Sequence, residues 1–185
     1  MKNAIIVIVL LVLLGLGGYG LSSYNSLVSS REAVSGRWAQ VESQYQRRFD
    51  LIPNLVEAVK GSMKQETAIF TAIAEARTRY AGAQSISDKA GAADELNSAF
   101  SRLLVIMEQY PQLKSIDTVT TLMSQLEGTE NRIAVERQRF NEEVQGYNVR
   151  VKRFPMSVIA GMGGFTPVEY TQAQAGAELA PRVSF

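Results

Sequence analysis

The stretch AIIVIVLLVLLGLGGYGL, residues 4–21, decides the architecture of this chain. It is free of charged side chains, and as a helix it would extend roughly 27 Å, which is just enough to cross the hydrocarbon core of a bilayer. Lys2 before the run and the small residues Ser22 and Ser23 after it also fit a cleaved signal peptide. We favour a retained transmembrane anchor at residues 1–22, because the run passes without a proline into a helical pattern.

The apolar run contains four glycines, at Gly15, Gly17, Gly18 and Gly20. Glycine is costly in a soluble helix but tolerated in lipid, where small side chains let helices approach closely. We therefore interpret these residues as a candidate surface for helix packing in the membrane. The alternative is lipid-exposed glycine near the interface, with Tyr19 and Tyr24 as aromatic anchors.

The composition excludes several classes of function. The chain has no histidine and no cysteine, so serine–histidine–aspartate catalysis, thiol catalysis and the usual zinc and di-iron sites cannot be built. A formal net charge of +1 gives no field that would favour nucleic acid. We expect no cofactor and no metal.

Beyond the anchor, apolar residues recur at steps of three and four, which predicts an all-α protein. The pattern predicts helices over residues 24–45, from about 52 to 80, after 87 until Pro111, and from 117 to 151. Asp50 can cap the second helix, and Pro53 fits its first turn. Short connections make residues 23–153 an antiparallel up-and-down four-helix bundle.

A polar pair is expected inside this bundle. If the chain turns at residues 49–50, Arg31 on the first helix falls opposite Glu66 on the second. Such a pair in an apolar seam would fix the register of the two helices. The alternative is that both side chains extend to solvent.

The segment FPMSVIAGMGGF, residues 154–165, is apolar and glycine-rich. It is too short to span a bilayer and too apolar to be left in water, so it covers the bundle, lies on lipid or binds another subunit. We place packing within the chain first and expect an extended tail to residue 185. The candidate oligomer or lipid contacts are Trp38, Phe154, Val158, Ile159, Met162 and Phe165.

No catalytic or nucleotide site is predicted. Carboxylates between residues 127 and 143 alternate with arginines, as on a solvated, salt-bridged helix face. The GMGG at residues 161–164 lacks the Lys-Ser or Lys-Thr of a phosphate loop. Basic residues at 47, 48, 150, 152 and 153 could meet a lipid surface, although solvated helix ends explain them as well.

Two longer blocks, RRFDLIPNLVEAVKG at residues 47–61 and EGTENRIAVERQRFNEEVQGYN at 127–148, resemble the LemA family. YNSLV at 24–28, YPQLKS at 110–115 and RFP at 153–155 are also similar, while 117–119 departs from the family pattern. The resemblance covers nearly the whole chain. The motif residues that we single out are Arg47, Arg48, Asp50, Pro53, Asn54, Glu127, Gly128, Thr129, Glu130 and Asn131.

The resemblance implies a bacterial membrane protein with one N-terminal span and a helical bundle, and it supplies no catalytic residues. We expect a non-enzymatic protein that forms a homo-oligomeric scaffold at the cytoplasmic membrane. The alternative is an adaptor for an envelope partner such as a membrane protease. Only Lys2 precedes the span, whereas Arg31, Glu32 and Arg37 follow it, so the charges near the span do not fix its orientation. We expect the N-terminus inside and the bundle on the extracytoplasmic side.

Overall fold

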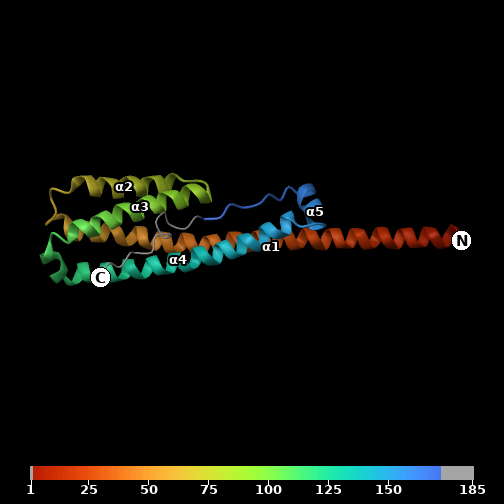
Figure 1. Cartoon of the computed structure of the whole chain (residues 1–185), viewed down its shortest axis with the longest axis horizontal. Helices are drawn as coiled ribbons and strands as arrows, with labels where there is room; N and C mark the ends of the chain where they lie inside the picture. The colour runs from red at the N-terminus through yellow and green to blue at the C-terminus, as the bar shows by residue number, and fades with distance from the viewer. Residues whose placement is uncertain (1, 172–185) are drawn as a thin grey trace, which may run out of the picture. The chain divides into compact units, whose positions relative to one another are not determined.

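The structure is a computed structural model that describes residues 2–171, and within this range it is all-helical (Figure 1). The predicted all-α fold is therefore confirmed. The predicted extended tail from residue 172 onward lies outside the described residues. The elements are α1 (Lys2–Lys60), α2 (Thr67–Gly82), α3 (Ile86–Met107), the 3-10 helix η1 (Pro111–Ser115), α4 (Asp117–Lys152) and α5 (Met156–Met162).

The chain divides into two compact units. Among the described residues, the first unit holds residues 2–37 and 139–170, and the second holds residues 38–138 and 171. Both α1 and α4 contribute residues to each unit. The units are defined by internal packing, so the expected division into 1–22, 23–153 and 154–185 stays a prediction.

In the second unit, α2 and α3 form an antiparallel pair, and successive helices run in alternating directions (Figure 1). Each helix buries one stripe, because residues three and four apart lie on one face. On α3 the stripe includes Leu96, Phe100 and Leu103. On α1 it consists of Trp38, Val41, Tyr45, Arg48, Ile52, Leu55 and Val59.

The predicted end of the third helix before Pro111 and the predicted start of the fourth near Asp117 are confirmed. The third helix begins at Ile86, two residues before the expected start after residue 87. Ser85 caps α3 by accepting a hydrogen bond from the backbone N–H of Asp88 at 2.9 Å. The helix α3 ends at Met107, and Pro111 then opens η1. Asp117 begins α4, as its pattern indicated.

The predicted turn at residues 49–50 is wrong, because α1 continues to Lys60 and the turn lies at residues 61–66. Pro53 is thus inside the helix, where it removes one backbone hydrogen bond at a cost of about 3 kcal/mol. Ile52, Leu55 and Val59 are fully buried and contribute about 1.5–3 kcal/mol each, which outweighs that loss. Asp50 does not cap a helix and instead accepts a hydrogen bond from Gln46.

The correction removes the argument for the Arg31–Glu66 pair. The pairing depended on a turn at residues 49–50, and no turn is there. Arg31 is exposed, and the buried position on that turn of α1 is Ser30. Glu66 is half-buried and precedes α2. The stripe passes one residue before Arg31 because the steps from Leu27 are three and then four.

The first unit contains the apolar run. In α1 this run is long and apolar enough to cross a membrane, and none of it is buried by other described residues. After the run, Leu27 and Val34 of α1 are buried in the first unit, as are Phe140 and Val144 of α4. Figure 1 shows α5 beside α1 and turned across its direction.

Candidate functional site: the groove beside Arg48 and Glu130

The two sequence blocks singled out above meet at an ion pair in the second unit. Arg48 of α1 is 4% exposed and pairs with the carboxylate of Glu130, which is half-buried on α4. The guanidinium carbon lies 5.4 Å from the centre of the Phe100 ring, within cation–π range. Burial lowers the pKa of Arg48 to about 10, and Tyr45 partly offsets this. Arg48 therefore remains a cation at neutral pH.

A groove of about 400 Å³ opens beside this pair, between α3 and α4. Its apolar wall is formed by Phe100, Leu104, Met123 and Leu126. Its polar groups come from Arg48, Asn97, Ser101, Glu127 and Glu130. Among the described residues, the amide nitrogen of the buried Asn97 has no hydrogen-bond partner. That nitrogen is itself buried, so what the groove presents to a ligand is chiefly its apolar wall.

The helix α3 is ion-paired to each of the other three helices of the second unit. Lys89 pairs with Glu42 of α1, Asp94 lies 3.0 Å from Arg137 of α4, and Glu95 lies 2.7 Å from Arg79 of α2. Each neighbouring helix is thus linked to α3 by one ion pair in addition to its apolar contacts.

An aromatic cluster joins Tyr80 of α2 to the buried side of α1. The Tyr80 ring is centred 4.3 Å from that of Phe49 and 5.9 Å from that of Tyr45. Burial raises the pKa of Tyr80, and the neighbouring Glu42 and Tyr45 raise it further. Burial likewise raises the pKa of Tyr45, although Arg137 and Arg48 oppose the shift. Both phenols stay protonated at neutral pH.

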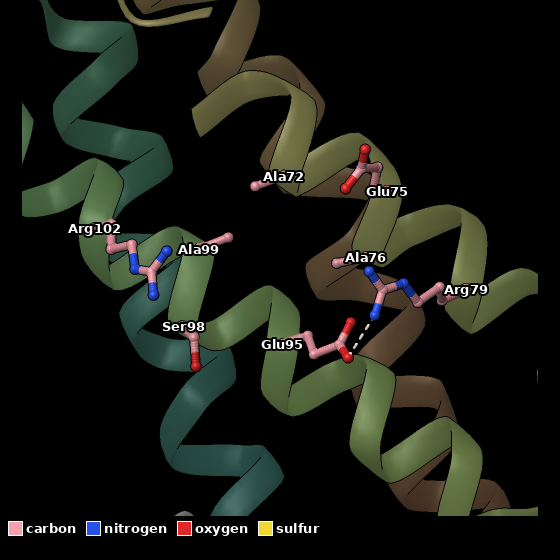
Figure 2. Close-up of a pocket in the computed structure, with 8 residues that line it drawn as sticks. All are labelled: Ala72, Glu75, Ala76, Arg79, Glu95, Ser98, Ala99 and Arg102. Carbon is pink, nitrogen blue, oxygen red and sulfur yellow. Dashed lines mark hydrogen bonds and ion pairs between the residues drawn. The ribbon is translucent and has the colours of Figure 1, made fainter. Parts of the chain in front are cut away.

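The outer seam between α2 and α3 forms a second, smaller groove of about 220 Å³ (Figure 2). Ala72 and Ala76 face it from α2 and Ala99 faces it from α3, so the two helices approach closely. The Arg79–Glu95 ion pair bridges the seam. Close packing of alanines explains this surface without a ligand.

The remaining motif residues lie mostly on the outside of the helices. Thr129 is the exception: it is buried, and its hydroxyl donates to the Leu126 carbonyl at 2.7 Å. Pro53 is half-buried. The exposed motif residues are Arg47, Asp50, Asn54, Glu127, Gly128 and Asn131. Of the motif residues, Arg48, Glu127 and Glu130 line the groove together.

Trp38 was expected to contact lipid or another subunit, and this expectation is wrong. The side chain is 7% exposed and lies edge-on to Tyr45, with ring centres 6.4 Å apart. It occupies a position on the buried stripe of α1, four residues after Val34 and three before Val41. Helical spacing accounts for its burial within the chain.

Sequence reasoning missed the contacts that hold residues 163–170 in the first unit. The Asn148 side chain donates to the Val168 carbonyl and accepts from the Val168 N–H, both at 2.8 Å. The Tyr147 hydroxyl donates to the carbonyl of Thr166 at 3.1 Å. The available signal in the sequence was Asn148, a polar residue directly beside Tyr147 of the apolar α4 stripe.

The four glycines of the apolar run are open on their outer side. A Cβ atom added at Gly15, Gly17, Gly18 or Gly20 would meet no other part of the described chain within 4 Å. Among the same described residues, no group of three or more metal-ligating side chains comes together. The glycines leave room for the close approach of another helix.

Comparison with known proteins places these features in a family. The LemA family model matches residues 37–185. Magnetosome proteins MamQ 1 and MamQ 2 of Paramagnetospirillum magneticum are each 27% identical over 178 residues, covering 82% of this chain and 65% of the relative. Magnetosome protein MamQ of Magnetospirillum gryphiswaldense is 29% identical over 176 residues, covering 81% and 65%. The chain thus spans 65% of the length of these relatives, and it belongs to the LemA family.

Proposed function

We propose that this protein is a non-enzymatic scaffold, anchored in the bacterial cytoplasmic membrane by α1 and assembled as a homo-oligomer. The observation that carries the proposal is the exposure of the apolar run. Side chains such as Leu14 and Leu21 are 72% and 71% exposed. Transfer of each such side chain out of water is worth about 1.5–3 kcal/mol, so the run favours a membrane strongly.

The open glycines support assembly of the anchors. Gly15 and Gly18 lie on one face of α1, three residues apart, and Ser22 follows four residues later. Small residues on one face let two membrane helices pack at short range, where van der Waals contacts stabilise the pair. Identical chains would present identical faces, as in a symmetric homo-oligomer.

Native mass spectrometry of the full chain in lipid nanodiscs tests the assembly. The wild-type protein should give an oligomer, and the variant Gly15→Leu/Gly18→Leu should shift it toward monomer. The control Val12→Leu/Leu16→Ile alters the same turns but keeps every glycine, so it should leave the oligomer intact. A wild-type monomer in nanodiscs and several detergents would exclude the scaffold.

A second candidate function is an adaptor for an envelope protein, such as a membrane protease, and the groove beside Arg48 favours it. The apolar wall of Phe100, Leu104 and Met123 suits an inserted apolar side chain of a partner. A photo-crosslinking residue at Ser101, which lines the groove, should capture one dominant heterologous protein in cells. The same residue at Val105, one turn further along α3, is the matched control. Self-adducts alone would count against the adaptor.

A further inference from the structure

The outer face of α5 is apolar and unpaired with the rest of the described chain. Phe154, Val158 and Met162 are 79%, 54% and 85% exposed. The whole segment 154–165 contains no charged side chain, whereas a helix face in water normally carries several. Adjacent exposed apolar side chains of this size mark a surface that contacts something other than water.

The opposite face of α5 is already used within the first unit. Ala160 is buried, and Met156 and Ile159 are half-buried. The Phe165 ring packs edge-on against Tyr24, with centres 5.4 Å apart. The prediction of packing within the chain thus holds for this face, and the outer face needs a different partner.

The contact with Tyr24 places this end of α5 at the end of the apolar run. Tyr24 follows Leu21 by three residues, which is roughly 4.5 Å along the helix. A Cβ at Gly163 would lie 2.7 Å from the Phe165 ring and 3.1 Å from the Tyr24 ring, so a larger residue there would displace these rings. The side chains of Tyr19 and Tyr24 are also exposed here, as is typical of residues at a membrane–water interface.

Hydrogen bonds hold the segments on either side of α5. Asn148 binds both backbone polar groups of Val168, and Arg150 of α4 donates to the hydroxyl of Ser30 on α1. The Arg150–Ser30 bond joins α4 to α1 shortly before α5 begins, and the Asn148–Val168 bonds join α4 to the segment after α5. These contacts within the first unit determine which way the outer face of α5 points.

The residues next to this face are basic. Lys152 and Arg153 are exposed and immediately precede Phe154. Lysine and arginine beside an apolar face are attracted to the anionic headgroups of a bacterial leaflet. A second copy of this chain would bring the same basic residues together, which disfavours it as the occupant.

We propose that α5 and Phe154 form a membrane foot, whose outer face lies in the boundary between headgroups and acyl chains of an anionic leaflet. The leaflet is the one from which α1 emerges. The foot gives the protein a second membrane contact beside its span and restrains its rotation about α1. This inference rests on the proposal that the apolar run spans a membrane.

Spin-label accessibility measurements on the full chain in vesicles of phosphatidylglycerol and phosphatidylcholine test the foot. The chain has no cysteine, so each single substitution carries one label. Val158→Cys and Met162→Cys are the test sites, Leu14→Cys reports the span, and Val105→Cys reports exposed water-facing helix. Oxygen collides with labels in lipid, and a polar nickel chelate collides with labels in water.

If the foot exists, the ratio of oxygen to nickel-chelate collision rates should be severalfold higher for labels at Val158 and Met162 than for a label at Val105. In the background Lys152→Gln/Arg153→Gln, this preference should weaken. If Leu14 reports lipid but Val158 and Met162 match Val105, the foot is excluded and the anchor stands. Shielding of both sites from both reagents would show a protein occupant and also overturn the foot. A water-exposed Leu14 would overturn the anchor itself.

Discussion

Arg48 of α1 and Glu130 of α4 form an ion pair that joins the two sequence blocks typical of the family. The arginine side chain is 5% exposed and the glutamate side chain 36%, so the cation depends on one partly solvated partner. The pair also lines the groove between α3 and α4. Its energetic role can be separated from its binding role by mutation.

Replacing one partner of this pair should be more harmful than replacing both. Glu130→Gln leaves the charge of Arg48 buried and should cost about 2–3 kcal/mol of unfolding free energy. The double variant Arg48→Met/Glu130→Met removes the buried charge and should stay within about 1 kcal/mol of the wild type. Urea unfolding in detergent, followed by circular dichroism, measures both. Equal losses in the two variants would contradict this account.

Two arginines that pair with α3 should differ in their importance for stability. The side chain of Arg79 is 61% exposed and that of Arg137 is 9% exposed, although both reach a carboxylate within 3.0 Å. Arg79→Met should change the unfolding free energy by about 0.5 kcal/mol or less, because exposed pairs are solvated and screened. Arg137→Met should cost about 2 kcal/mol or more. Similar losses of unfolding free energy in both variants would show that burial does not determine how much these ion pairs contribute to stability.

Tyr80 should make the protein sensitive to alkaline pH. Its pKa in the folded chain lies above the ordinary value of 10.0, chiefly because it is buried. The unfolded chain therefore releases this proton first, so the stability from Tyr80 is present below pH 10 and lost above it, by up to about 1.4 kcal/mol per pH unit. Urea unfolding at pH 7 and pH 11 should show a smaller loss in Tyr80→Phe than in the wild type.

A matched tyrosine provides the control for that experiment. Among the described residues the Tyr80 hydroxyl has no hydrogen-bond partner, so Tyr80→Phe should cost nothing at pH 7. Tyr147→Phe removes the bond to Thr166 and should cost about 1 kcal/mol. An equal decline of the wild type and Tyr80→Phe between the two pH values would refute the assignment.

Loss of the Asn148 side chain should loosen residues 163–170 before the rest of the protein. Asn148→Leu removes two hydrogen bonds of 2.8 Å and should cost about 1–3 kcal/mol locally. Hydrogen exchange at the Val168 amide should accelerate, while exchange at the Leu103 amide should not. Asn131→Leu, an exposed position on the same helix, is the control. Unchanged exchange at Val168 would show that the Asn148 hydrogen bonds do not hold the segment after α5.

The sequence by itself determined the apolar run, the all-α class, the end of α3 and the start of α4. These features follow from local chemistry: an uncharged run of sufficient length, three–four spacing of apolar residues, and the helix-breaking Pro111. The same spacing already contained Arg48, three residues after Tyr45 and four before Ile52. Only its charge argued against burial, and that charge is compensated by a residue distant in sequence.

The tertiary structure decided where α1 ends and which polar residues meet. Pro53 predicted a helix start, but burial of apolar residues on both sides of it keeps α1 helical. Because the chain does not turn at residues 49–50, the expected pairing of Arg31 with Glu66 loses its basis. The pairing of Arg48 with Glu130 depends on residues far apart in the chain. So does the difference between the buried and the exposed face of α5. Helical periodicity identifies a face, whereas the partner of that face is chosen by packing and by charge compensation across helices.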